Sequence, residues 1–122
     1  MSAASSSFRS TADGKEIFTY AWTDVAGKPI GVVQIAHGLA EHGERYARFA
    51  KALNAAGFLV HAADHRGHGR SAQGRLGDFG TAGFGGLIAD VAQFGAALRA
   101  RHSSLPLFLF GHSMGSFAAQ AA

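Results

Sequence analysis

The chain has 122 residues, of which 48% are hydrophobic and 16% charged, a composition and length that favour one domain with a packed core and exclude a disordered chain. It contains no cysteine, which excludes disulfides, a thiolate nucleophile and a cysteine zinc site and favours a reducing, cytoplasmic location. The formal net charge is +3, but the basic residues are scattered and form no run beside aromatic residues, so nucleic acid is not an expected partner.

The first third of the chain predicts a short tail and a hairpin. Residues 1–7 are small and polar, which predicts a flexible N-terminal tail and no secretory signal peptide. We expect residues 8–122 to form one partial domain. Phe8 to Trp22 predicts a β-hairpin, because Ala12-Asp13-Gly14 suits a turn and aromatic residues alternate along the second arm. Residues 24–29 predict a loop.

Apolar strands then alternate with helical segments. Buried strands are predicted over 30–36, 58–63 and 107–110, the last a continuous apolar run of the kind that is buried on both faces. Helices are predicted over 44–56, 84–101 and from 116 to 122, and Gly57 stands where the first should stop. The expected buried positions are Tyr46, Phe49, Ala50 and Leu53 on the first helix, and Phe84, Leu87, Ile88, Val91 and Leu98 on the second. This order predicts an α/β fold in which a parallel sheet, made mixed by the hairpin, is covered on both faces.

One motif stands between the last strand and the last helix. Residues 111–115 read Gly-His-Ser-Met-Gly, a G-x-S-x-G pattern. This pattern in a strand–turn–helix context is typical of a serine nucleophile held on a strained turn, at which larger flanking side chains would collide with their neighbours. The helix that follows would aim its N-terminus at a developing oxyanion. Ser113 is therefore the candidate nucleophile.

Two further motifs precede it in the chain. Residues 37–46 read His-Gly-Leu-Ala-Glu-His-Gly-Glu-Arg-Tyr, and residues 64–71 read Asp-His-Arg-Gly-His-Gly-Arg-Ser. In this order and spacing, the three motifs resemble the monoacylglycerol lipase and lysophospholipase branch of the α/β-hydrolases, which is serine aminopeptidase-like. The similarity extends over nearly the whole chain after the first few residues.

The resemblance implies a site and a substrate class. Ser113 would be the nucleophile, and the backbone N–H groups of Leu39 and Met114 would form the oxyanion hole. Structural residues near the site would be His37, Gly38, Asp64, Gly111, His112 and Gly115. The substrate would be a small ester, an acylglycerol or a lysophospholipid, with no metal and no other cofactor.

The sequence departs from that family's pattern after the motif. In α/β-hydrolases the triad acid and histidine follow the nucleophile, whereas residues 116–122 contain no Asp, Glu or His. The expectation is the N-terminal half of an α/β-hydrolase fold, truncated after the elbow and inactive by itself. The missing part would include the cap, through which such a protein could make peripheral membrane contact. A non-catalytic fragment or pseudo-enzyme is the alternative, and a binding module a third; nothing favours a particular oligomeric state.

Other motifs admit a second interpretation. A cluster of His61, Asp64, His65 and His68 partly fits a zinc-hydrolase loop, but position 63 is Ala where such a loop has a ligand, which favours a bent structural loop. His37 or His42 could act as a base, although His37 better suits a role in fixing a turn through hydrogen bonds. Gly83 to Gly86 could cradle a phosphate, but it lacks the Lys-Ser/Thr ending and better fits the start of a helix.

Overall fold

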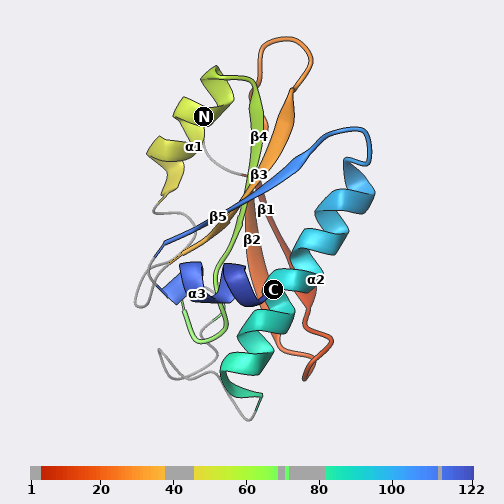
Figure 1. The fold of residues 1–122 in the computed structure, drawn as a ribbon, viewed down its shortest axis with the longest axis vertical. Helices are drawn as coiled ribbons and strands as arrows, with labels where there is room; N and C mark the ends of the chain where they lie inside the picture. The colour runs from red at the N-terminus through yellow and green to blue at the C-terminus, as the bar shows by residue number, and fades with distance from the viewer. Residues whose placement is uncertain (1–3, 38–45, 69–70, 72–81, 113) are drawn as a thin grey trace.

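The computed structural model describes residues 4–37, 46–68, 71, 82–112 and 114–122, which form one mixed sheet with helices on both faces (Figure 1). The strands are β1 (Ala4–Arg9), β2 (Glu16–Trp22), β3 (Gly31–Ala36), β4 (Phe58–Ala63) and β5 (Leu107–Gly111). The helices are α1 (Ala47–Ala55), α2 (Gly83–Arg101) and α3 (Met114–Ala121). The predicted α/β class and element order are confirmed.

The predicted hairpin is present and is longer than expected. β1 and β2 pair antiparallel, with Gly14 at a positive φ of 76° in the connecting turn. β1 begins at Ala4, not at Phe8, because residues 4–7 complete the ladder opposite residues 18–21 of β2. Ladder hydrogen bonds therefore override the weak strand propensity of Ser5 to Ser7.

The strand order is β1-β2-β4-β3-β5. β2 pairs antiparallel with β4, whereas β3 pairs parallel with both β4 and β5. The carboxyl ends of β3, β4 and β5 therefore lie at the same edge of the sheet, which we call the carboxyl edge. All three sequence motifs start at this edge. The motifs that begin at residues 37 and 64 directly follow β3 and β4, and the G-x-S-x-G motif begins with the last residue of β5.

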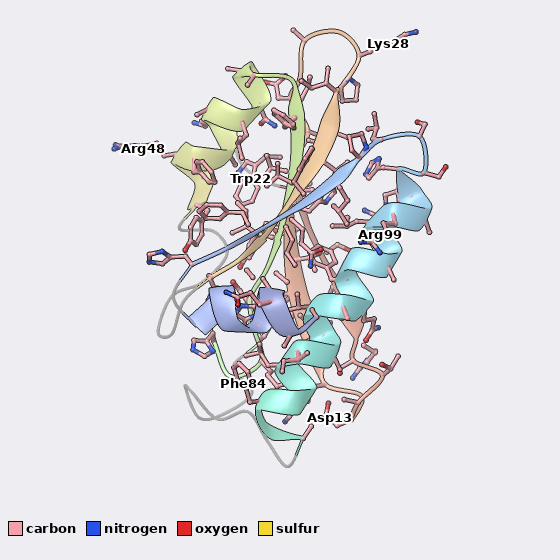
Figure 2. All side chains as sticks on the ribbon, viewed as in Figure 1. Asp13, Trp22, Lys28, Arg48, Phe84 and Arg99 are labelled. Atoms are coloured by element: carbon pink, nitrogen blue, oxygen red, sulfur yellow. The ribbon has the colours of Figure 1, made fainter. Side chains whose placement is uncertain are left out.

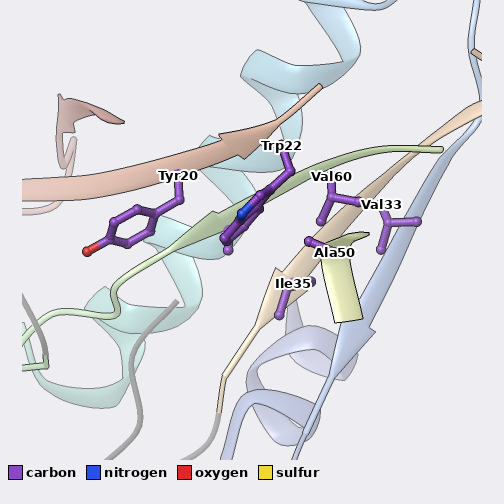
Figure 3. Close-up of a cluster of buried hydrophobic side chains, with 7 residues drawn as sticks. Tyr20, Trp22, Val33, Ile35, Ala50 and Val60 are labelled. Atoms are coloured by element: carbon purple, nitrogen blue, oxygen red, sulfur yellow. The ribbon is translucent and has the colours of Figure 1, made fainter. Parts of the chain in front are cut away.

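One face of the sheet packs against α1. Its core consists of Tyr20, Trp22, Val33, Ile35, Ala50, Val60 and Ala62 (Figure 3). The amide of Asn54 on α1 donates hydrogen bonds to the carbonyls of Trp22 (3.0 Å) and Phe58 (2.8 Å), which ties the helix to β2 and β4. α1 ends at Ala55, and Gly57 follows with a φ of 101°, as expected for a helix stop at this glycine.

The other face packs against α2 and α3. Ile17, Ala63, Phe94 and Leu98 form one cluster there, and Leu87, Val91 and Ala118 form another. Phe49 and Phe84, both predicted to be buried, are 38% exposed. Phe94, absent from the prediction, is buried and stacks on Phe8 with ring centroids 5.7 Å apart.

The prediction that β5 is buried on both faces is wrong for the described part of the chain. Phe108 is 51% exposed, and Leu109 and Phe110 are each 39% exposed. The reason is topological: among the described strands β5 pairs only with β3 and so forms an edge of the sheet. Within the described ranges, no helix has the length and apolar character needed to span a membrane.

A buried histidine makes the fold sensitive to acid. Burial is the main cause that lowers the pKa of His61 from 6.5 to about 4, with smaller contributions from His102 and Arg101. Between these values the unfolded chain binds a proton that the folded chain does not bind, so stability is complete above pH 6.5 and is lost as the pH falls toward 4. The loss through this group is about 3 kcal/mol.

Urea denaturation at pH 7.5 and pH 5 measures most of this loss, about 2 kcal/mol, because pH 5 lies between the two pKa values of His61. The His61→Leu variant keeps an apolar side chain of similar size, so its free energy of unfolding should change less between the two pH values than that of the wild type. An equal change in both proteins would show that His61 does not cause the acid sensitivity.

Candidate active site

His37 and His65 hold the carboxyl ends of β3 and β4 together. The backbone N–H of His65 donates to Nε2 of His37 at 2.9 Å, and Nε2 of His65 lies 3.1 Å from the carbonyl oxygen of His37. A carbonyl can only accept, so the neutral imidazole of His65 carries its proton on Nε2, whereas Nε2 of His37 is unprotonated. Both side chains are buried, so this reciprocal pair is a buried link between the ends of the two strands.

Gly115 brings the start of α3 against the end of β3. A Cβ placed on Gly115 would lie 2.1 Å from the carbonyl oxygen of Ala36 and 2.4 Å from that of His37. The N–H of His112 also donates to the Ala36 carbonyl, at 3.1 Å. No side chain fits between these backbones, which explains in steric terms why the last position of G-x-S-x-G is glycine here.

Asp64 is fully buried directly after β4. Its Oδ2 accepts a hydrogen bond from the hydroxyl of Tyr20 at 2.7 Å, and its N–H donates to the carbonyl of Phe18 at 2.9 Å. Ser71 anchors the far end of the same segment, since its Oγ accepts from the N–H of Phe18 at 2.9 Å. The described ends of the Asp64–Ser71 motif are thus both attached to β2.

Arg66 lies at the centre of a buried ionic network. Its guanidinium donates to both carboxylate oxygens of Asp90 on α2, at 2.8 and 3.1 Å, and to Asp13 in the β1–β2 turn at 2.7 and 3.2 Å. Ser10 accepts from Arg66 at 2.9 Å and donates to Asp90. The Arg66 side chain has no exposed surface. One arginine therefore joins the segment after β4, the hairpin turn and α2.

The electrostatics favour a charged Arg66 and a neutral His65. Burial alone would lower the pKa of Arg66, but hydrogen bonds to Asp90 and Asp13 outweigh it and raise that pKa. The hydrogen bond from Arg66 lowers the pKa of Asp13. Burial, reinforced by His37 and His68, holds the pKa of His65 well below its usual value.

The structure brings together part of the expected site. His37, Asp64, Gly111, Gly115 and the first residue of α3, Met114, lie at the carboxyl edge of the sheet, and His112 follows β5 with its side chain exposed. Ser113, Gly38, Leu39 and His42 lie outside the described residues. Their roles, and the role of the Met114 N–H, stay predictions.

The structure also bears on the histidine cluster and on the glycine-rich segment 83–86, each of which had two interpretations. The histidine cluster is divided, since His61 lies beside Phe94 and His102 on the α2 side, whereas the rings of His65 and His68 contact that of His37. In the described ranges no group of three His, Asp or Glu side chains is arranged so that it could hold a metal ion. α2 begins at Gly83, in agreement with a helix start at the glycine-rich segment.

The sequence interpretation did not identify the Arg66 network. One signal was available: Asp90 interrupts the apolar stripe of α2 between Leu87 and Val91, and a buried carboxylate needs a cationic partner. Tyr20 is one of the aromatic residues that alternate along the second arm of the hairpin, a pattern that indicates a strand and no polar contact. Its bond to Asp64 has no sequence signal, because the two residues are 44 positions apart.

Comparisons with known proteins agree with this geometry. The family model described as serine aminopeptidase, S33, matches residues 27–122. A putative monoglyceride lipase of Schizosaccharomyces pombe is 40% identical over 100 residues, covering 82% of this chain and 26% of that protein. A monoacylglycerol lipase of Mycolicibacterium smegmatis is 42% identical over 94 residues, covering 71% of this chain and 30% of that protein.

A solved structure is also similar to this chain. A thermostable carboxyl esterase from Bacillus coagulans, crystallised with glycerol, superposes with a TM-score of 0.87 and 37% identity, covering 97% of this chain and 38% of the esterase. The chain spans about 26–30% of the length of the two lipases.

Proposed function

Because the chain belongs to the serine aminopeptidase S33 family of α/β-hydrolases, in its monoacylglycerol lipase branch, we propose that it carries the nucleophile half of a serine hydrolase for carboxylic esters. The proposed substrate class is monoacylglycerols or lysophospholipids, in line with the lipases to which the chain is similar. A cytoplasmic location belongs to the same proposal and rests on the absence of cysteine.

The observation that carries the proposal is the packing of Gly115 on the carbonyls of Ala36 and His37. Such an approach is what a nucleophile elbow needs, since the strand-to-helix turn must be tight and the helix must start at the carboxyl edge of the sheet. Residue 113, between the end of β5 and the start of α3, is the serine of the motif.

The proposed reaction is acyl transfer through Ser113. Its Oγ attacks the ester carbonyl, and the N–H groups of Leu39 and Met114 hold the tetrahedral oxyanion. The carbon–oxygen bond to the alcohol then breaks, the alcohol leaves with a proton, and water hydrolyses the acyl-serine to the free acid. The base must come from elsewhere, because Nε2 of His37 is occupied by the His65 N–H and His65 is buried as a proton donor.

The 122-residue chain by itself is expected to give no turnover of p-nitrophenyl butyrate above the background rate. A serine hydroxyl needs an oriented histidine for activation, and in this fold both triad partners follow the nucleophile. The Ser113→Ala variant should be indistinguishable from the wild-type chain. Turnover that is lost in Ser113→Ala would contradict this expectation.

A chimera tests the proposed activity itself. Residues 1–122 are joined to the remaining C-terminal part of the M. smegmatis monoacylglycerol lipase, the 42% identical relative. We expect hydrolysis of p-nitrophenyl butyrate and of a monoacylglycerol, with kcat at least about 10⁴-fold lower in the Ser113→Ala chimera. A folded chimera without Ser113-dependent turnover would overturn the proposal.

A non-catalytic role is the second candidate, and the exposure of β5 is the observation that favours it. Phe108 and its two neighbours leave an apolar strand edge uncovered in the described chain, and such edges favour association with other chains. This candidate predicts an inactive chimera, so the same experiment separates the two.

A further inference from the structure

The carbonyl oxygen of His37, at the end of β3, contacts two other segments of the chain. Nε2 of His65, in the segment after β4, donates a hydrogen bond to it at 3.1 Å. Gly115, in the first turn of α3, packs against the same oxygen, since a Cβ on this glycine would lie 2.4 Å from it. One backbone carbonyl therefore lies between the segment after β4 and the start of α3.

Both proposed oxyanion donors belong to the chain beside this carbonyl. Met114 immediately precedes Gly115, and Leu39 is two residues after His37. Because the peptide group is planar, the direction of the His37 carbonyl also sets the direction in which the chain continues from β3. An oxyanion hole needs donors that are in place before the charge develops, and a misplacement of about 1 Å can cost about 100-fold in rate. The group that orients this carbonyl therefore matters for both donors.

His65 lies in a segment that buried contacts hold on both sides. Asp64, which precedes it, is fully buried and is hydrogen-bonded to β2. Arg66, which follows it, forms ion pairs with α2 and with Asp13 of the β1–β2 turn. Figure 2 shows Asp13 at the same end of the molecule as Phe84, which is in the first turn of α2. The His65 imidazole is therefore carried by a backbone that is attached to β2, to α2 and to the hairpin turn.

The His65 imidazole has a single N–H to donate. Burial holds its pKa well below the usual value, so the ring is neutral at pH 7, and a neutral imidazole carries one proton. This proton is on Nε2 and is directed at the His37 carbonyl, while the backbone N–H of His65 donates to Nε2 of His37 at 2.9 Å. His65 therefore directs a side-chain donor and a backbone donor at the same residue.

We propose that His65 is a positioning residue, whose Nε2–H fixes the carbonyl of His37 and thereby the distance between the two oxyanion donors. It acts through the backbone of its neighbours and takes no part in proton transfer to or from the ester. The inference rests on the proposed function, because it assigns His65 a role in the same ester hydrolysis.

The kcat and KM of the chimera described above test this role with a pair of amide variants. In His65→Asn the shorter side chain cannot bring an N–H to the position of Nε2, so kcat for p-nitrophenyl butyrate should fall at least about tenfold. KM should change less than about twofold, since the donors act on the transition state. In His65→Gln the longer side chain places an amide N–H close to that position, and kcat should stay within about threefold of the wild-type value.

Two further variants separate positioning from a general loss of folded protein. His65→Leu also lacks the donor and should behave like His65→Asn. His61→Leu is the matched control, because His61 is another buried histidine but lies on the α2 side, and its kcat should stay within about twofold of the wild-type value. The kcat values are expressed per active site, counted with an alkyl fluorophosphonate.

A transition-state analogue gives the specific readout. A trifluoromethyl ketone forms a tetrahedral adduct that carries an oxyanion, so its inhibition constant should rise in His65→Asn by about the factor by which kcat/KM falls. The inference is overturned if His65→Asn and His65→Leu keep the wild-type kcat, if His65→Gln is as slow as His65→Asn, or if the inhibition constant does not change. An inactive wild-type chimera is a different result, which overturns the proposed function and this inference together.

Discussion

Replacing Gly115 with alanine is expected to lower the free energy of unfolding by about 3 kcal/mol or more. The new Cβ would lie 2.1 and 2.4 Å from the carbonyl oxygens of Ala36 and His37. Both are backbone atoms of β3 and its end, so they cannot turn away as a flexible side chain can. Either α3 moves off the sheet or the chain fails to fold.

Gly85→Ala is the matched control for this substitution. Gly85 is also a helical glycine, but a Cβ there would meet nothing within 4 Å, and alanine has the higher helix propensity. We expect Gly85→Ala to be neutral or to stabilise the chain by up to about 1 kcal/mol. Urea denaturation of the three proteins measures both effects, and equal stability of Gly115→Ala and the wild type would show that α3 does not pack on β3 as described.

The second large effect is expected at Arg66. Arg66→Met keeps an unbranched side chain of similar length but leaves the carboxylate of Asp90, which is 4% exposed, without its cation. Removing one partner of a buried ion pair costs about 3–5 kcal/mol. The loss should appear as a lower midpoint in urea.

A double variant and a variant of an exposed arginine show whether the stability loss in Arg66→Met comes from the unpaired carboxylate of Asp90. Adding Asp90→Asn to Arg66→Met removes the stranded charge, so the two losses should be non-additive by more than about 1 kcal/mol. Arg9→Met alters an exposed arginine whose side chain donates to the carbonyl of Gly14 in the described chain, and it should cost less than about 0.5 kcal/mol. Additive losses at Arg66 and Asp90 would contradict the buried network.

Local patterns were sufficient to predict much of the fold. The apolar run 58–63 has the bounds of β4, and Gly57 stands just after α1, because a positive φ and a buried run are properties of a few adjacent residues. The hairpin followed from Gly14 and the alternating aromatics. What failed depends on neighbours distant in the sequence: residues 4–7 are ordered by β2, and β5 is exposed by its position at the sheet edge.

The same distinction holds for the site. The motifs identified His37, Asp64 and Gly115 because family-specific spacing marks them, and the structure adds the contacts that explain two of them. Arg66 could not be paired from sequence, since its partner Asp90 lies 24 positions away and the Ser10–Asp90 bond spans 80 positions. Only the fold shows that one arginine joins three segments.

The most direct test of the central claim, that Ser113 is the nucleophile, is mass spectrometry of the active chimera after reaction with an alkyl fluorophosphonate. Such a reagent forms a covalent bond with an activated serine, and peptide mapping identifies the modified residue. The account predicts one phosphonyl group on the peptide that contains Ser113, with none in Ser113→Ala. Modification of a different residue, or an active chimera that keeps Ser113 unmodified, would contradict it.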